Sequence, residues 1–361
     1  MFDARLENIG LLSVDGKNNL VLLKPNSIGQ KYILDNRLNN NRSLNAPIYI
    51  DLYPSFICNY NCNFCYNKYL NNCSEKIMSK KVVNKIIEYC ANKKILGLNI
   101  VGGEPYHPQN IDITKYIVKK ASTIGLRANI TTNLSYVNKS IVTFCKKYDV
   151  KFNASFISTD KNIGEKVSGS KKYLAQEIID KYIDKNIAYG LSTPILKINA
   201  KDIFQTANYL NTLTGCAWVL RYVTVPKTYN LNLSLTEFYK ISKKVIAKTN
   251  KKVYFDAPFS YKYFNIAPPQ NKLDFLYCGC KAGFLKVEFM PNGDVYPCIM
   301  LKKVGKIGNI LINDDFILQD HRKVNCKNIN CKYNVFCTGC PGYAFLNKIN
   351  CDNRCGDFCG N

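Results

Sequence analysis

The stretch FICNYNCNFCY, residues 56–66, decides the fold, because it sets three cysteines at the spacing C-x3-C-x2-C. It directly follows a short apolar run at residues 48–52, which predicts a buried strand. Three thiolates at this spacing can converge on one compact site. A structural zinc ion needs four ligands, whereas a [4Fe–4S] cluster held by three cysteines leaves one iron open to a substrate or cofactor. The loop therefore favours an iron–sulfur cluster, and a zinc site completed by Cys73 is the alternative.

Beyond this loop, strand patterns alternate with helical patterns as far as residue 249. Repeated strand–helix units predict a parallel sheet with right-handed crossovers. The strands are short apolar runs, as in a sheet buried on both faces, and functional residues should follow their carboxyl ends. The expected strands are 48–52, 98–101, 127–131, 151–156, 190–196 and 218–225; the expected helices are 79–92, 113–124, 139–148, 172–185, 201–213 and 234–249.

Composition limits the class of protein. The chain has 361 residues and is 47% hydrophobic, which is enough for a sizeable core. It has neither an apolar run of about 18 residues, as a membrane span needs, nor a secretory signal, so we expect a cytoplasmic protein. Ten of the 17 cysteines fall between Cys278 and Cys359. Because disulfides are rare in the cytosol, these cysteines indicate metal ligation.

The formal net charge of +24 is carried mainly by lysine, since only seven of the 50 basic residues are arginine. Proteins that read nucleic-acid sequence favour the bidentate arginine fork. We therefore do not expect a nucleic-acid partner, and an acidic substrate or redox partner is favoured. One arginine, Arg221, falls in the sixth predicted strand, where it either binds a carboxylate in the barrel mouth or forms a surface ion pair.

The cysteine loop resembles the C-x3-C-x-aromatic-C motif of the radical S-adenosylmethionine (SAM) superfamily, with Phe64 at the aromatic position. The resemblance implies that Cys58, Cys62 and Cys65 bind the cluster. It implies that the open iron takes the amino and carboxylate groups of SAM. Reductive cleavage would then yield a 5′-deoxyadenosyl radical, and the cofactor carries that chemistry while the protein supplies position and shielding.

The resemblance also implies SAM-binding groups at the ends of later strands. The turn GGEP at residues 102–105 matches a family element whose glycines allow close backbone approach. A third strand ends in Thr-Thr-Asn, and Leu134 stands where relatives often have glycine. For the two candidates near the fifth strand, Thr193 and Asn199, an ordinary strand-end role is the alternative. The cofactor-binding residues so implied are Phe64, Gly102, Gly103, Glu104, Pro105, Asn133, Ser155 and Thr193.

The C-terminal cysteines resemble the SPASM extension of radical SAM enzymes, through Gly293-x4-Cys298 and a later run of cysteines that departs from the family spacing at two places. The resemblance implies two auxiliary [4Fe–4S] clusters, and two zinc sites are the alternative. Ile299 stands where sulfatase-modifying relatives carry aspartate, so we do not expect that activity. The first cluster would take Cys278, Cys280, Cys298 and Cys340; the second would take Cys326, Cys331, Cys337 and one of Cys351, Cys355 and Cys359.

Together the resemblances imply a partial (β/α)6 TIM-like barrel at residues 46–265 and a cysteine-rich α+β domain at 275–361. Residues 1–45, with strands expected at 11–14 and 19–23, are interpreted as a trimmed leader-binding element. The expected function is that of a radical SAM oxidoreductase.

Its expected substrate is a ribosomal peptide or protein side chain, modified by thioether or carbon–carbon cross-linking, epimerisation or dehydrogenation. The expected partners are a peptide with an acidic leader and an electron donor such as flavodoxin or ferredoxin. A radical SAM enzyme acting on a non-peptide small molecule is the alternative. A zinc-dependent nucleic-acid-binding protein is a more distant one.

Overall fold

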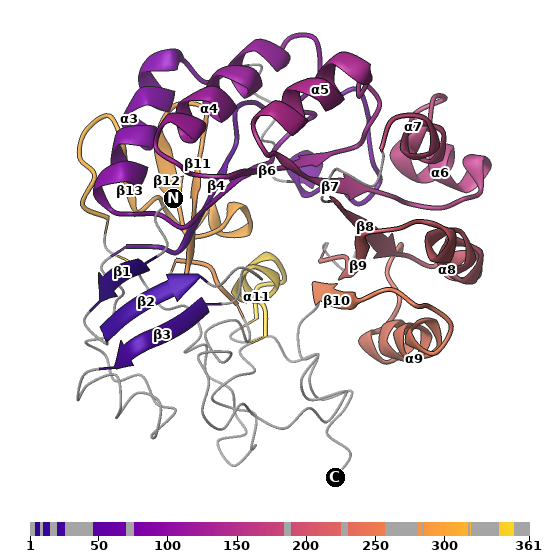
Figure 1. Ribbon diagram of the computed structural model, residues 1–361. Helices are drawn as coiled ribbons and strands as arrows, with labels where there is room; N and C mark the ends of the chain where they lie inside the picture. Colours follow the sequence, from indigo (N-terminus) through magenta and orange to yellow (C-terminus); the bar gives the residue numbers. More distant parts are fainter. Residues whose placement is uncertain are drawn as a thin grey trace.

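The computed structural model describes residues 4–7, 10–14, 20–25, 46–69, 76–183, 189–224, 230–256, 280–283, 285–316, 318 and 339–349. Its main body is a strongly curved sheet with helices along its outer side (Figure 1). This arrangement confirms the predicted partial barrel.

Within these described ranges, eight neighbouring strands of the main sheet are parallel, in the order β10-β9-β8-β7-β6-β5-β4-β11. All six predicted strands are present, and β10 and β11 extend the sheet at its two sides. Two antiparallel strands, β12 (Asp294–Tyr296) and β13 (Gly308–Asn309), follow β11. The parallel strands are β4 (Tyr49–Leu52), β5 (Gly97–Ile100), β6 (Ala128–Thr132), β7 (Lys151–Ser155), β8 (Tyr189–Ile195), β9 (Cys216–Tyr222), β10 (Val253–Asp256) and β11 (Lys286–Phe289).

The helices begin and end where local capping residues allow. Ser79, where the expected helix begins, caps it by accepting a hydrogen bond from the backbone N–H of Val82. The helix predicted at 172–185 is present but shorter, at residues 175–182. A helix before it was not predicted; Asp160 caps it and Gly169 ends it in the left-handed conformation. The helices outside the sheet are α3 (Lys80–Asn92), α4 (Ile111–Thr123), α5 (Lys139–Lys147), α6 (Lys161–Ser168), α7 (Ala175–Tyr182), α8 (Ile203–Thr212) and α9 (Leu235–Ile246).

The prediction that the strands are apolar on both faces is wrong. The face toward the helices is buried and largely apolar, with Leu98, Ile130 and Leu220 at 0% exposure. The opposite, inner face carries polar side chains, and burial alternates along β6 and β7 with the period of two that a strand imposes. An incompletely closed barrel leaves its inner face accessible, so polar residues are tolerated there.

The N-terminal residues form a separate three-stranded antiparallel sheet of β1 (Ala4–Glu7), β2 (Gly10–Val14) and β3 (Leu20–Pro25). The two strands predicted in this region are confirmed as β2 and β3, and β1 was not predicted. In the described ranges, no helix has the length and apolar character needed to cross a membrane.

Candidate functional site

The three cysteines of the loop lie directly after β4, between Tyr53 and the short helix α2 (Tyr66–Tyr69). Burial raises the pKa of Cys58 to about 12, and the neighbouring Glu104 and Cys65 add to this effect. Burial also raises the pKa of Cys62, to which Cys65 and Cys58 contribute. Ionisation of one thiol therefore disfavours ionisation of the others. A positively charged group placed among the three sulfurs would offset this repulsion between thiolates.

A cluster fits these donors better than a single metal ion does. Within the described residues, no three side chains of Cys, His, Asp or Glu come together closely enough to hold one metal ion. Each thiolate of a [4Fe–4S] cluster binds a different iron, so a cluster spaces its ligands more widely. Cys73, the fourth ligand of the zinc alternative, lies outside the described residues.

The GGEP turn after β5 packs directly against the backbone of the cysteine loop. The N–H of Gly103 donates to the carbonyl of Ser55 at 2.9 Å, and that of Glu104 donates to the carbonyl of Ile57 at 2.9 Å. Gly102 has φ +114°, and a Cβ on Gly103 would lie 2.0 Å from the Ile57 oxygen. The expected close backbone approach is present, and it holds the cysteine loop in place.

Substituting this glycine should damage the cluster site. We expect Gly103→Ala to displace the loop at Ile57, at a cost of about 1–3 kcal/mol for an overpacked position, and to reduce the iron bound per chain after anaerobic reconstitution. Gly190→Ala is the matched control, because its Cβ would meet Ala217 at an ordinary 3.7 Å. Equal iron content in the two variants would contradict this role of the turn.

Glu104 connects the ends of two neighbouring strands. Its carboxylate is 1% exposed, and it accepts hydrogen bonds from the Thr132 hydroxyl at 2.7 Å, the Asn133 N–H at 2.7 Å and the Tyr106 N–H at 3.1 Å. Burial raises the pKa of Glu104 to about 7, although these hydrogen bonds lower it. A cationic ligand group beside this carboxyl would favour its ionised form.

Asn133 joins the end of β6 to the cysteine loop. Its side-chain N–H donates to the Asn59 side-chain oxygen at 3.0 Å and reaches the sulfur of Cys58 at 3.7 Å. The next residue, Leu134, has φ +69° and is fully buried. The left-handed conformation that glycine adopts freely costs a leucine roughly 1–2 kcal/mol, which burial of its side chain offsets.

The other predicted residues are placed differently. Phe64 packs against the hydrophobic core, and the Pro105 carbonyl accepts a hydrogen bond from Thr114 at 2.8 Å. Ser155 ends β7 on the inner face, opposite Ser192. Thr193 is not brought to this site, because it lies on the helix-covered face at 0% exposure, where its hydroxyl accepts from the Trp218 indole N–H at 2.9 Å.

Part of the predicted auxiliary site is described. The pKa of the Cys298 thiol is raised by burial and by neighbours that include Cys280. Cys340 caps the helix α11 (Pro341–Leu346), which packs against the short 3-10 helix η2 (Ile299–Leu301) after Cys298. The other predicted ligands lie outside the described residues: Cys278, Cys326, Cys331, Cys337, Cys351, Cys355 and Cys359.

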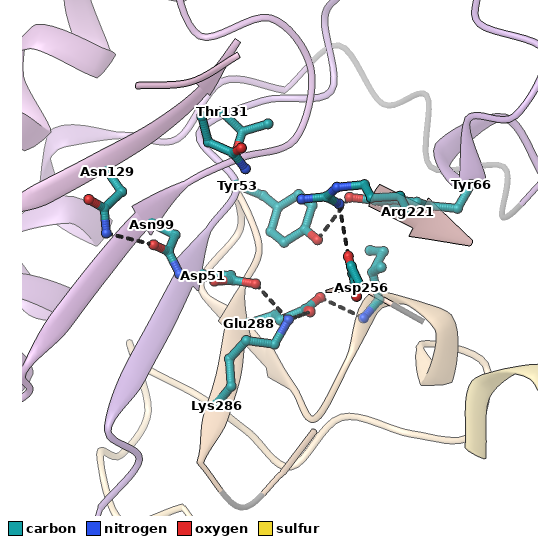
Figure 2. A network of polar contacts seen from close by, with 12 residues as sticks. Asp51, Tyr53, Tyr66, Asn99, Asn129, Thr131, Arg221, Asp256, Lys286 and Glu288 are labelled. Atoms are coloured by element: carbon teal, nitrogen blue, oxygen red, sulfur yellow. Dashed lines mark hydrogen bonds and ion pairs between the residues drawn. The ribbon is translucent and has the colours of Figure 1, made fainter. Parts of the chain in front are cut away.

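A polar network on the inner face was not predicted. Lys286 on β11 donates to Asp51 on β4 at 2.6 Å and to Glu288 at 2.7 Å (Figure 2). Burial raises the pKa of Glu288, and Asp51 adds to this, while the Lys286 charge opposes it. The network continues across the sheet, because the Asn99 side-chain N–H donates to Asp51 at 2.8 Å and that of Asn129 donates to Asn99 at 3.1 Å. The sequence signal for this network was the set of polar residues that alternate with apolar ones along these strands.

The family described as "4Fe-4S single cluster domain" matches residues 53–176. That range holds the cysteine loop, the GGEP turn, Asn133 and Ser155.

Several curated proteins are similar in sequence. An uncharacterised protein of Methanocaldococcus jannaschii is 25% identical over 301 residues, which cover 81% of this chain and 93% of that protein. The antilisterial bacteriocin subtilosin biosynthesis protein AlbA of Bacillus subtilis is 22% identical, over 80% of this chain and 67% of its own. The S-adenosylmethionine-dependent nucleotide dehydratase of Psychrobacter lutiphocae is 25% identical over only 35% of this chain and 47% of its own.

Among solved structures, the fold is similar to that of Streptococcus suis SuiB bound to precursor peptide SuiA. The TM-score is 0.78 at 19% identity, and the match covers 98% of this chain and 99% of that one. SuiB bound to S-adenosylmethionine also matches, with a TM-score of 0.72 at 18% identity over 91% of this chain and 80% of that one. At these identities the likeness shows a shared fold.

Proposed function

Since the chain is a radical SAM enzyme whose cofactors are a [4Fe–4S] cluster and SAM, we propose that it modifies a side chain or backbone carbon of a ribosomally made peptide. The observation that carries this proposal is the clamped cysteine loop. Three thiols that belong to one short segment are held against the GGEP turn, next to an inner face that is polar and partly exposed.

Two relatives favour a peptide over a small molecule. The matched SuiB structure holds its precursor peptide, and AlbA takes part in making a bacteriocin. Both likenesses extend over most of this chain. The nucleotide dehydratase is the main support for a small-molecule substrate, and its likeness is confined to about a third of the chain.

The residues of the site have different roles in binding the cluster and SAM. Cys58, Cys62 and Cys65 would hold the cluster, and Glu104 would meet the amino group of SAM. Asn133 fixes the loop by bonding to Asn59 beside Cys58. When bound, the cluster and SAM supply a 5′-deoxyadenosyl radical that abstracts a hydrogen atom from the substrate.

The inner face of the sheet would orient the bound peptide. Its amide and hydroxyl side chains can hold a polar chain through hydrogen bonds, whereas the apolar outer face is closed by helices. A flavodoxin or ferredoxin would deliver the electron. Whether the product is a thioether, a carbon–carbon cross-link, an epimer or a dehydrogenated residue depends on the substrate.

The proposal is tested by anaerobic incubation of the full chain with SAM, a reductant and candidate peptides, followed by mass spectrometry. A peptide whose mass changes only with SAM and reductant present would support it. Release of 5′-deoxyadenosine with a nucleotide or other small molecule altered, and no peptide altered, would favour the small-molecule alternative.

We further propose that the C-terminal cysteines hold two auxiliary clusters. About 12 irons and little zinc per chain are then expected after anaerobic reconstitution, from three four-iron clusters. Iron and zinc are measured by plasma mass spectrometry. About eight irons would indicate one auxiliary cluster only, and about four irons with stoichiometric zinc would contradict auxiliary iron–sulfur clusters altogether.

A further inference from the structure

Arg221 lies at the carboxyl end of β9, beside Asp256 at the carboxyl end of β10. The two residues are opposite each other in the parallel register, and an N–H nitrogen (Nη1) of Arg221 lies 3.2 Å from an Asp256 carboxylate oxygen. The guanidinium Nε also donates to the hydroxyl of Ser192 on β8. The Arg221 side chain is therefore oriented from two sides while 40% of it remains exposed.

The surroundings of Arg221 belong to the inner face. Ser192 is 4% exposed and lies opposite Ser155, the last residue of β7. Asn153, two residues before Ser155 on β7, is also on the inner face, and its side-chain N–H donates to the Thr131 hydroxyl on β6 at 3.3 Å. Figure 2 draws Arg221 and its contact with Asp256 in the same close view as Asp51 and Tyr53.

A second ion pair shows that pairing by itself does not mark a functional arginine. Arg127 lies 2.5 Å from Asp149, and the exposed fractions of the two side chains, 35% and 64%, nearly equal those of Arg221 and Asp256, 40% and 64%. Arg127 and Asp149 precede β6 and β7, at the amino ends of the strands. Parallel barrels bind ligands at the carboxyl ends, where Arg221 lies.

We propose that Arg221, on the inner face of the sheet, is a carboxylate anchor for the substrate, and that it binds an acidic side chain or a terminal carboxylate of the peptide. This inference rests on the proposed function. The planar guanidinium has five N–H donors, of which Ser192 and Asp256 occupy two. The remaining donors can bind a carboxylate through two parallel hydrogen bonds, a geometry that lysine cannot provide.

The first test uses the reconstituted full chain and two small probes, N-acetyl-glutamate methylamide and N-acetyl-glutamine methylamide. Arginines are modified with phenylglyoxal, and the rate at each site is followed by peptide mass spectrometry. We expect the glutamate probe to slow modification of Arg221 several-fold and the glutamine probe to leave it unchanged. Arg127 serves as an internal control whose rate neither probe should change.

The second test compares variants by saturation-transfer NMR with the glutamate probe. Arg221→Gln should weaken binding about tenfold or more, as expected when a charge-assisted hydrogen-bond pair is lost. Arg127→Gln removes the same charge and should bind the probe like the unmodified chain. Arg221→Lys keeps the charge without the fork, so intermediate binding is expected, and circular dichroism verifies that each variant is folded.

If the glutamate probe slowed phenylglyoxal modification of Arg221 and Arg127 equally, or slowed neither, the proposed role of Arg221 would be overturned. Equal loss of binding in the two glutamine variants would also overturn it, because that result means net charge attracts the probe. Failure of the proposed function has a different signature, since it would be seen as no 5′-deoxyadenosine release or no altered peptide. If the chain cleaved SAM but the glutamate probe did not slow modification of Arg221, the role proposed for Arg221 would be rejected and the proposed function would stand.

Discussion

Replacing Cys58, Cys62 or Cys65 by alanine is expected to reduce SAM cleavage to the uncatalysed level while the barrel stays folded. A cluster with one open iron needs all three thiolates, and none of the three cysteines is itself a member of the buried core, although Cys62 packs against it. The measurement is 5′-deoxyadenosine release under anaerobic conditions, together with iron content and a circular dichroism spectrum.

Cys90→Ala is the matched control for these substitutions. Cys90 is fully buried on α3, and burial alone raises its pKa, so it behaves as a small apolar side chain. We expect this variant to keep the cluster and the cleavage activity. Cleavage near the unsubstituted rate in any of the three loop variants would reject the cluster assignment.

The second large effect is expected for Lys286→Met, which should lower the free energy of unfolding by about 3–5 kcal/mol. Burial lowers the pKa of Lys286, but the adjacent Asp51 and Glu288 outweigh it and keep the ammonium charged. Glu288 is 1% exposed and also accepts the Ile299 N–H at 2.5 Å. Without the ammonium, two carboxyl groups remain buried beside each other. Urea denaturation measures the loss.

Lys306→Met provides the comparison. Lys306 is half exposed and pairs with Asp294 at 2.8 Å, so its loss should cost far less stability than the loss of Lys286, because solvent screens an exposed ion pair. Adding Asp51→Asn and Glu288→Gln to Lys286→Met should restore part of the stability, because the buried charges are then removed together. A cost for Lys286→Met no greater than that for Lys306→Met would show that the network does not stabilise the junction of β4 and β11.

Local patterns predicted most of the barrel. The helical period located α3 and α4 close to their observed bounds. The observed cap of α3, Ser79, lies at the start of the expected range, because capping is a short-range interaction. The helix α6 was not predicted, and this omission had a local cause too, since Asp160 and Gly169 were not used as its cap and stop. The polar inner face was missed because short strands were interpreted by their apolar residues alone.

The sequence by itself determined the chemistry of the cluster loop, because the three thiols lie within eight residues and their spacing needs no distant contact. Tertiary structure decided which residues join them. Glu104 and Asn133 meet through the parallel register of β5 and β6. Thr193 was excluded from the site because the alternation of β8 directs it to the helix-covered face. Register and strand order arise from packing of the whole sheet, so no single segment encodes them.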